Sequence, residues 1–343
     1  MKIVVDAMGG DHGLDPTVEG AVQASREPGV HVILVGDQDQ IRDRLDRLSG
    51  KKSSLEVCHA SQTVGMQESP ALVARKKRDS SIWVGTNLVK TGEAQAVVSA
   101  GNTGATMVAA FFLLGSIQGI ERPAIAASLP TRKGMAVMLD VGATVDCTAQ
   151  QLYQFGIMGY EYGKHILGLS GPRVGLLSIG EEDMKGNEVT KEAFRMLKES
   201  PINFIGNVEG RDVYSGNADV IVCDGFIGNV ALKISEGLAD ALKKILMKEI
   251  AQSRLGRLAY LFMAAPLLRL RRRMDYAEFG GAPLLGVNGV SVICHGRSSA
   301  KAIKNAILRA DKLAEAGLID QIRDDIAHGL KSAAAEPPMK TQE

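Results

Sequence analysis

The sequence has few cysteines and few aromatic residues. Its 343 residues include four cysteines and one tryptophan, and aromatic side chains make up 4%. The cysteines lie far apart, without the closely spaced pairs that zinc sites and redox motifs require. We therefore expect reduced, mostly buried thiols in a cytosolic protein, at Cys58, Cys147, Cys223 and Cys294.

Neither sign of charge dominates, and long hydrophobic runs are missing. The 40 lysines and arginines balance 39 aspartates and glutamates, so no overall field attracts the chain to nucleic acid. No stretch approaches the roughly 20 apolar residues of a membrane-spanning helix. The opening "MKIVVDAMGG" reaches an aspartate after three apolar residues, which is too short for a signal peptide. We expect a protein that is neither secreted nor transmembrane.

Two nucleotide-binding motifs are also missing. The sequence has neither the G-x-G-x-x-G pattern nor the Walker A pattern. This argues against NAD bound in the standard Rossmann mode and against an ATP P-loop.

The chain does contain a series of short apolar runs rich in Val and Ile, and the overall apolar content of 45% is ample for a core. Such runs are typical of strands covered on both faces. Segments with helical spacing lie between them, which predicts a doubly wound, mostly parallel sheet. The runs are "KIVVDA", "HVILVGD", "AQAVVSA", "MAVMLDVG", "RVGLLSIG", "ADVIVCDG" and "SVICHG", and the helical spacings include Ile41, Leu45 and Leu48, and Val230, Ile234, Leu238 and Leu242.

We expect one domain over residues 1–330, with a helical hairpin at 253–275, and a disordered tail over 331–343. Six predicted strands end in polar, glycine-containing stretches. Ligands of such sheets lie at the carboxyl ends of the strands, so these stretches predict a binding site, although glycines that merely end strands explain each one alone. They are "DAMGGDHG", "SAGNTGA", "LDVGAT", "SIGEEDMKGNE", "GNVEGRD" and "CDGFIGN".

The stretch "SAGNTGATM" is rich in hydrogen-bond donors and contains no acid or base. Asn102 or Thr103 can cap a helix that begins near Gly104, which leaves neighbouring backbone amides free to bind an anion such as phosphate. The candidate phosphate-binding residues are Ser99, Gly101, Asn102, Thr103 and Gly104.

Four polar side chains at other strand ends are candidate catalytic residues. Lys185 can neutralise phosphate and polarise a carbonyl group, or it can be a solvated lysine paired with its acidic neighbours Glu181, Glu182 or Asp183. His12 is a candidate for general acid work or phosphate binding, with a structural role as the alternative. Asp224 and Asn229 follow another strand, where helix capping is the alternative.

The stretch from Ser253 to Asp275 combines apolar and basic residues. An apolar run from Leu258 to Leu268, broken by Pro266, leads into four arginines, so we expect two short helices with an apolar tip. The tip can enter a bilayer interface while the arginines meet anionic headgroups, or it can pack on a second subunit, or both. The candidate membrane-binding residues are Leu258, Leu261, Phe262, Leu267 and Leu268.

The motifs together resemble the bacterial phosphate acyltransferases of phospholipid synthesis, in consistent order from about Lys2 to Ile307. Thr144 and Ser178 stand where that family usually has asparagine. The stretches that carry the resemblance are "DAMGGDHG", "MQESPALVARKKRDSS", "SAGNTGA", "GIERPA", "LDVGATVDC", "RVGLLSIGEEDMKGNE", "GNVEGRD", "VCDGFIGNVALK", "GGAPLLGVNG" and "HGRSSAKAIKNAI".

The resemblance implies a three-layer α/β/α sandwich, related to phosphate acetyltransferases and isopropylmalate-type dehydrogenases. It also implies a homodimer and loose attachment to the inner face of the cell membrane through the hairpin. The implied substrates are acyl-acyl carrier protein and inorganic phosphate, the product is acyl phosphate for a membrane glycerol-3-phosphate acyltransferase, and Lys185 is implied to orient phosphate. Plausible contacts for an acidic carrier are the hairpin arginines and Lys243, Lys244 or Lys248.

This reaction suits a donor-rich loop without acids or bases. A thioester is already activated, and phosphate is itself an anionic nucleophile, so the protein needs to supply positioning and oxyanion stabilisation. We therefore expect no metal, no cofactor and no nucleic-acid partner. The alternatives are a metal- and NAD-dependent hydroxy-acid dehydrogenase of related fold, for which "CDGF" offers a single aspartate, and a non-catalytic anion-binding protein that docks on membranes.

Overall fold

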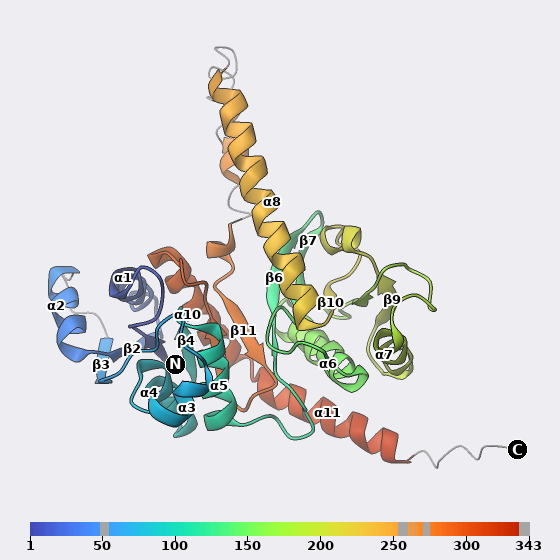
Figure 1. The fold of residues 1–343 in the computed structure, drawn as a ribbon, viewed down its shortest axis with the longest axis horizontal. Coiled ribbons are helices and arrows are strands. Elements are labelled where there is room, and N and C mark those ends of the chain that lie inside the picture. The colour runs from blue at the N-terminus through green and yellow to red at the C-terminus, as the bar shows by residue number, and fades with distance from the viewer. Residues whose placement is uncertain (49–54, 253–259, 261, 264, 270–274, 336–343) are drawn as a thin grey trace, which may run out of the picture.

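The structure, a computed structural model, describes residues 1–48, 55–252, 260, 262–263, 265–269 and 275–335 (Figure 1). The strands are β1 (Lys2–Asp6), β2 (His31–Gly36), β3 (Leu55–His59), β4 (Ala96–Ser99), β5 (Ala124–Ile125), β6 (Ala127–Thr131), β7 (Gly134–Leu139), β8 (Val174–Leu177), β9 (Phe204–Val208), β10 (Val220–Val222), β11 (Ala282–Leu285) and β12 (Val290–Ile293). The helices are α1 (Leu14–Ala24), α2 (Gln38–Leu48), α3 (Ala71–Lys76), α4 (Ser81–Lys90), α5 (Thr103–Leu114), α6 (Ala149–His165), α7 (Glu188–Glu199), α8 (Gly225–Gln252), α10 (Ala300–Glu315) and α11 (Leu318–Ala335).

The described strands form two sheets, in the orders β3-β2-β1-β4-β12-β11-β5 and β6-β7-β10-β8-β9. Within them, β11 pairs with both of its neighbours antiparallel and β6 pairs antiparallel with β7, whereas the other pairs are parallel. The expected α/β class is confirmed. The parallel strands are divided between two sheets, because β5 pairs with β11 while the strand that follows it, β6, pairs with β7.

Helices cover both faces of the seven-stranded sheet. Ile3 and Val5 of β1 pack in an apolar cluster with residues of α1 and α10. Val4, between them, packs with residues of α4 and α5. Successive side chains of a strand point to opposite faces, so both faces are buried, which explains why this run is apolar throughout.

The five-stranded sheet is covered in the same way. Val137 and Leu139 of β7 pack with Phe155 of α6, whereas Met138 lies in an apolar cluster that includes Ala231 of α8. The cluster that contains Ile3 also contains Val137, so one continuous core connects the two sheets.

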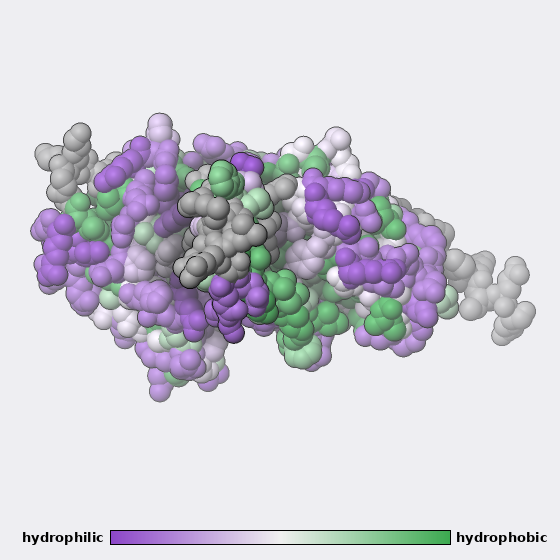
Figure 2. Space-filling view, turned by 90° about the horizontal axis from the view of Figure 1, so that it is seen from above, coloured by the Kyte–Doolittle hydropathy of each residue, from purple (hydrophilic) through white to green (hydrophobic). Residues whose placement is uncertain are grey.

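Helix α8 projects far from the body of the molecule (Figure 1). The helix expected from Val230, Ile234, Leu238 and Leu242 is confirmed, but these side chains are 42–64% exposed. Figure 2, which views the molecule from the side to which α8 projects, shows apolar surface gathered beside the projection.

Part of the expected hairpin, including Leu258 and Leu261, lies outside the described residues. Residues 260, 262–263 and 265–269 are helical. Phe262 is 81% exposed, Leu268 is about half exposed and Leu267 is half-buried.

The C-terminal helix is longer than the sequence predicts. Helix α11 continues to Ala335, so the expected disordered tail begins with five helical residues. Residues 336–343 lie outside the described part. The apolar residues that dock α11, such as Leu318, Ile322 and Ile326, explain where the helix is anchored. None of the helices in the described ranges combines the length and the apolar character needed to cross a membrane.

Candidate active site

Glycine-containing loops meet at the carboxyl ends of the strands in two places. The first loop cluster consists of residues 6–13, 99–104 and 294–297, after β1, β4 and β12. The Asp11 amide donates to the Gly296 carbonyl at 2.7 Å, and a methyl group at Gly9 would lie 2.6 Å from the Gly101 nitrogen. The second loop cluster consists of residues 140–147 and 223–229, after β7 and β10.

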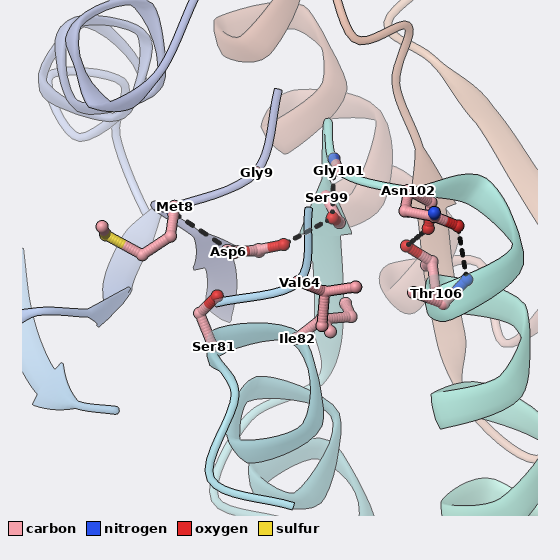
Figure 3. A pocket seen from close by; sticks show the side chains of 11 residues that line it. Asp6, Met8, Gly9, Val64, Ser81, Ile82, Ser99, Gly101, Asn102 and Thr106 are labelled. Carbon is pink, nitrogen blue, oxygen red and sulfur yellow. Dashed lines mark hydrogen bonds between the residues drawn. The ribbon is translucent and has the colours of Figure 1, made fainter. Parts of the chain in front are cut away.

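A buried carboxyl group, that of Asp6, organises the first loop cluster (Figure 3). The Ser99 hydroxyl donates to Asp6 at 2.7 Å, and the Met8 amide donates to it at 3.2 Å. The Gly101 amide in turn donates to the Ser99 hydroxyl at 3.0 Å. Burial raises the pKa of the Asp6 carboxyl, and hydrogen bonds from Ser81 and Ser99 partly offset this. The network ties the loop after β4 to the end of β1.

Asn102, one of the two candidates for the cap of α5, is the cap. Its side-chain oxygen accepts a hydrogen bond from the Ala105 amide at 3.0 Å. Its side-chain nitrogen donates to the carbonyls of Met66 and Glu68, at 3.0 Å each. The Asn102 side chain therefore holds a neighbouring segment in place, and its polar atoms are already used within the protein.

The backbone amides of Thr103 and Gly104 donate to no other residue in the part of the chain that the structure describes. They are the first two amides of α5, which have no acceptor within the helix. A side chain at Gly104 would collide with the loop above it, because a methyl group there would lie 2.4 Å from Cγ of Pro70. Ser99 and Gly101 were also candidates for binding phosphate. In the structure the Gly101 amide donates to the Ser99 hydroxyl instead.

His12 belongs to the first loop cluster by its position in the loop after β1. Its side chain is exposed. No hydrogen bond or ion pair connects the His12 side chain to another described residue. The side chain therefore lies at the exposed surface of the cluster.

The second loop cluster has its own buried carboxyl group, that of Asp140. Its oxygens accept hydrogen bonds from the amides of Ile125 at 2.8 Å, Gly142 at 3.1 Å, Ala143 at 2.9 Å and Thr144 at 2.6 Å. Burial raises the pKa of Asp140, and these backbone bonds oppose the rise. Because the amides of 142–144 turn inward to the carboxyl group, they are not open to a ligand.

Asp224 and Asn229 lie at the start of α8. Asp224 accepts hydrogen bonds from the amides of Phe226 at 2.8 Å and Cys147 at 2.9 Å. It thus has the capping role that was the alternative to catalysis, and it also connects the two loops of the cluster. Asn229 is exposed, and a methyl group at Gly142 would lie 3.7 Å from its Cβ.

Lys185 is exposed in the loop after β8, and its ammonium group forms no ion pair with another described residue. Two of the acidic neighbours that could have neutralised it are paired elsewhere. Glu181 binds Arg211 at 2.9 Å, and Asp183 binds Lys198 at 2.8 Å. The Lys185 charge is therefore available to a ligand.

The loop that carries Lys185 is held by Asn207 of β9. The Asn207 side chain donates to the Glu182 carbonyl at 2.9 Å, and the Lys185 amide donates to the same carbonyl at 2.9 Å. The Lys185 stem folds over Gly180, where a methyl group would lie 2.9 Å from its Cγ.

The two departures from the family pattern have different surroundings. The Thr144 hydroxyl donates to the Pro123 carbonyl at 3.2 Å. The Ser178 hydroxyl is buried, and no described residue forms a hydrogen bond with it.

One apolar cluster contains residues of both α5 and α8. Met107 and Ala110 of α5 belong to the same apolar cluster as Val141 and as Ala231 and Leu232 of α8. Helix α5, which begins at the first loop cluster, and helix α8, which begins at the second, therefore pack in one apolar layer.

Sequence reasoning missed three residues that organise the site, namely Asp6, Asp140 and Asn207. Asp6 and Asp140 both follow a run of buried apolar residues directly, and an acid in that position is a signal that could have found them. Asn207 has no such signal, because it is one polar residue inside a strand.

The chain matches known proteins over most of its length. The profile of a family described as "Fatty acid synthesis protein" matches residues 1–321. A protein named phosphate acyltransferase from Pelotomaculum thermopropionicum is 54% identical over 327 residues, which is 95% of each chain. Another with that name, from Trichlorobacter lovleyi, is 51% identical over 95% of each chain.

Solved structures show the same fold. A phosphotransacetylase from Streptococcus pyogenes has a TM-score of 0.62 at 20% identity, over 92% of this chain and 94% of that one. A phosphotransacetylase from Staphylococcus aureus has a TM-score of 0.61 at 16% identity over the same shares. The fold, the nearly complete coverage and the high identity to curated relatives agree, and this chain belongs to the fatty acid synthesis protein family.

Proposed function

We propose that this protein transfers an acyl group from a thioester to inorganic phosphate, giving acyl phosphate and a free thiol. The observation that carries the proposal is the start of α5, where the Thr103 and Gly104 amides lack partners among the described residues. Relatives that are about half identical to this chain bear the name phosphate acyltransferase, which agrees with an anion site of this kind.

Phosphate binds at the start of α5, where two free amides and the positive end of the helix dipole attract an anion. Gly104 lets Pro70 pack against the start of the helix, where a Cβ would lie 2.4 Å from Cγ of Pro70. Asn102 supports the site as the helix cap, while Ser99 and Gly101 support it through their mutual hydrogen bond. Lys185 supplies the positive charge that orients phosphate and polarises the acyl carbonyl group.

In the reaction, a phosphate oxygen attacks the thioester carbonyl carbon, and the carbon–sulfur bond then breaks to release a thiolate. A thiol has an ordinary pKa of about 8.5, so it is a good leaving group. Asn229 orients the acyl donor, and Asp224 acts by holding the start of α8. His12 takes the proton that the attacking phosphate loses and passes it to the departing sulfur.

The protein itself forms no covalent bond to the acyl group. The second loop cluster contains two cysteines, Cys147 and Cys223. Burial raises the pKa of Cys147 to about 12 and raises that of Cys223 as well. Both thiols therefore keep their protons at neutral pH, and a protonated thiol is a poor nucleophile.

The acyl donor is a fatty acyl group on acyl carrier protein, and the product feeds a membrane glycerol-3-phosphate acyltransferase in phospholipid synthesis. The protein is a cytoplasmic homodimer attached to the inner membrane face. The exposed apolar side chains along α8, and Phe262 and Leu268 beyond it, support contact with a second subunit or with lipid.

A thiol-release assay with acyl-acyl carrier protein tests this function. Release of the carrier thiol should require added phosphate, and acyl phosphate should appear in equal amount. Acylated enzyme, trapped by acid quench and found by mass spectrometry, would contradict direct transfer. Thiol release without phosphate would contradict the proposed reaction itself.

A further inference from the structure

The position of the phosphate loop depends on a buried chain of hydrogen bonds. The Gly101 amide donates to the Ser99 hydroxyl at 3.0 Å, and that hydroxyl donates to the Asp6 carboxyl at 2.7 Å. Asp6 is 3% exposed and Ser99 is 1% exposed. Figure 3 shows the two side chains facing each other between the end of β1 and the end of β4.

We propose that Asp6 is a positioning residue for phosphate, acting through Ser99 on the loop that leads into α5. This inference rests on the phosphate site proposed above. Asp6 and Ser99 are almost fully buried and line a small pocket together with Gly101 and Asn102. Their effect on the reaction passes through the backbone of Gly101.

The loop has little freedom to adjust if this chain is broken. Gly9 and Gly101 are in close backbone contact, since a methyl group at Gly9 would lie 2.6 Å from the Gly101 nitrogen and 2.8 Å from an Asp6 oxygen. Gly101 stands two residues before Thr103, whose amide is the first of α5. Hydrogen bonds weaken steeply as distance and angle depart from their preferred values, so a small shift of Gly101 changes phosphate binding.

The Asp6 carboxyl group is surrounded by hydrogen-bond donors. The Ser99 hydroxyl and the Met8 amide donate to the carboxyl group, and further hydrogen bonds come from Ser81 and Gly9. These donors offset part of the cost of burying the carboxyl group.

The test is a double-mutant cycle with Asp6→Asn, Ser99→Ala and the double variant, measured as KM for phosphate and KM for the acyl donor. Ser99→Ala should raise KM for phosphate about tenfold, since Gly101 loses its acceptor, and should leave KM for the acyl donor within about twofold. The double variant should be no worse than Ser99→Ala, because Asp6 acts through Ser99.

Ser291→Ala is the matched control. Ser291 is also 1% exposed and lies on the adjacent strand β12, but its hydroxyl forms no hydrogen bond with any residue that the structure describes. It should leave both KM values unchanged. If Ser99→Ala does not fold, Ser99→Cys keeps the side-chain size with a weaker donor and acceptor.

Three outcomes would overturn the inference: a KM for phosphate in Ser99→Ala equal to that in Ser291→Ala, an equal rise in KM for the acyl donor, or additive effects in the cycle. These results differ from a failure of the proposed function. In that case the wild-type protein would release thiol without phosphate, and the cycle would have no phosphate dependence to measure.

Discussion

The first and second loop clusters are each held in place by a buried aspartate, but through different hydrogen bonds. Each has an aspartate at the end of a buried strand, and each aspartate holds a glycine-containing loop. Asp6 reaches its loop through a serine hydroxyl. Asp140 binds its loop directly, through the amides of Gly142, Ala143 and Thr144.

The difference decides what each cluster can offer a ligand. The loop around Asp140 donates three successive amides to the carboxyl group. Side chains therefore remain for a ligand, such as Asn229 and, in the loop after the neighbouring strand β8, Lys185. In the loop held by Asp6, the Gly101 amide donates to Ser99. The amides of Thr103 and Gly104 have no partners in the described structure. A backbone anion site is therefore expected in the first cluster, and side-chain charge beside the second.

The largest expected effect separates the two aspartates. Asp140→Asn should lower the free energy of unfolding by about 3 kcal/mol, because in either orientation its amide group faces backbone donors. Asp6→Asn should cost about 1 kcal/mol, since the Ser99 hydroxyl can rotate and accept from the new amide. Urea denaturation of both variants measures the difference. An equal or larger loss for Asp6→Asn would show that the two carboxyl groups are not held differently.

The next effect concerns catalysis beside the second cluster. Lys185→Ala should reduce kcat/KM by about 100-fold, since it removes the positive charge that we propose stabilises the developing oxyanion. The fold should be unaffected, because Lys185 is exposed and makes no ion pair with a described residue. The thiol-release assay measures the loss.

The control for Lys185 is Lys191→Ala, six residues further along, where the lysine pairs with Glu188 at 3.4 Å. It should keep full activity. A Lys185→Ala variant with normal folding and full acyl phosphate formation would remove Lys185 from the mechanism.

The smallest effect comes from a third buried carboxyl group, which lacks a shell of backbone amides. Glu161 of α6 binds His165 at 3.0 Å and lies beside Lys164 and Asp325. Burial, and then the hydrogen bond to Asp325, raises its pKa from 4.5 to about 7.

A raised carboxyl pKa means that the folded state binds the proton more tightly. The contribution of Glu161 to stability is therefore complete below pH 4.5 and is lost as the pH rises through about 7. Glu161→Gln stays neutral, so its melting temperature should fall by a few degrees less than that of the wild type between about pH 5 and about pH 8. Parallel melting curves for the two proteins would contradict this assignment.

Much of the fold and part of the site could be predicted from sequence. Each of the seven apolar runs forms a strand, because Val and Ile side chains on both faces require cover on both faces. The cap at Asn102 and the start of α5 follow from local chemistry, since a cap and its helix are only a few residues apart. The same local chemistry left the roles of Lys185 and Asp224 open between ligand binding and structure.

Contacts between distant segments decided the rest. Glu181 pairs with Arg211 and Asp183 pairs with Lys198, so neither acid pairs with Lys185. These ion pairs join the Lys185 loop to a distant turn and to α7. The link from Asp6 to Ser99 spans 93 residues, and the split into two sheets depends on which partner each strand meets. The sequence by itself determined the elements and their caps, because these depend on neighbouring residues. Only the tertiary structure decided which polar groups satisfy one another and which stay open to a ligand, because those pairs form only when the sheets assemble.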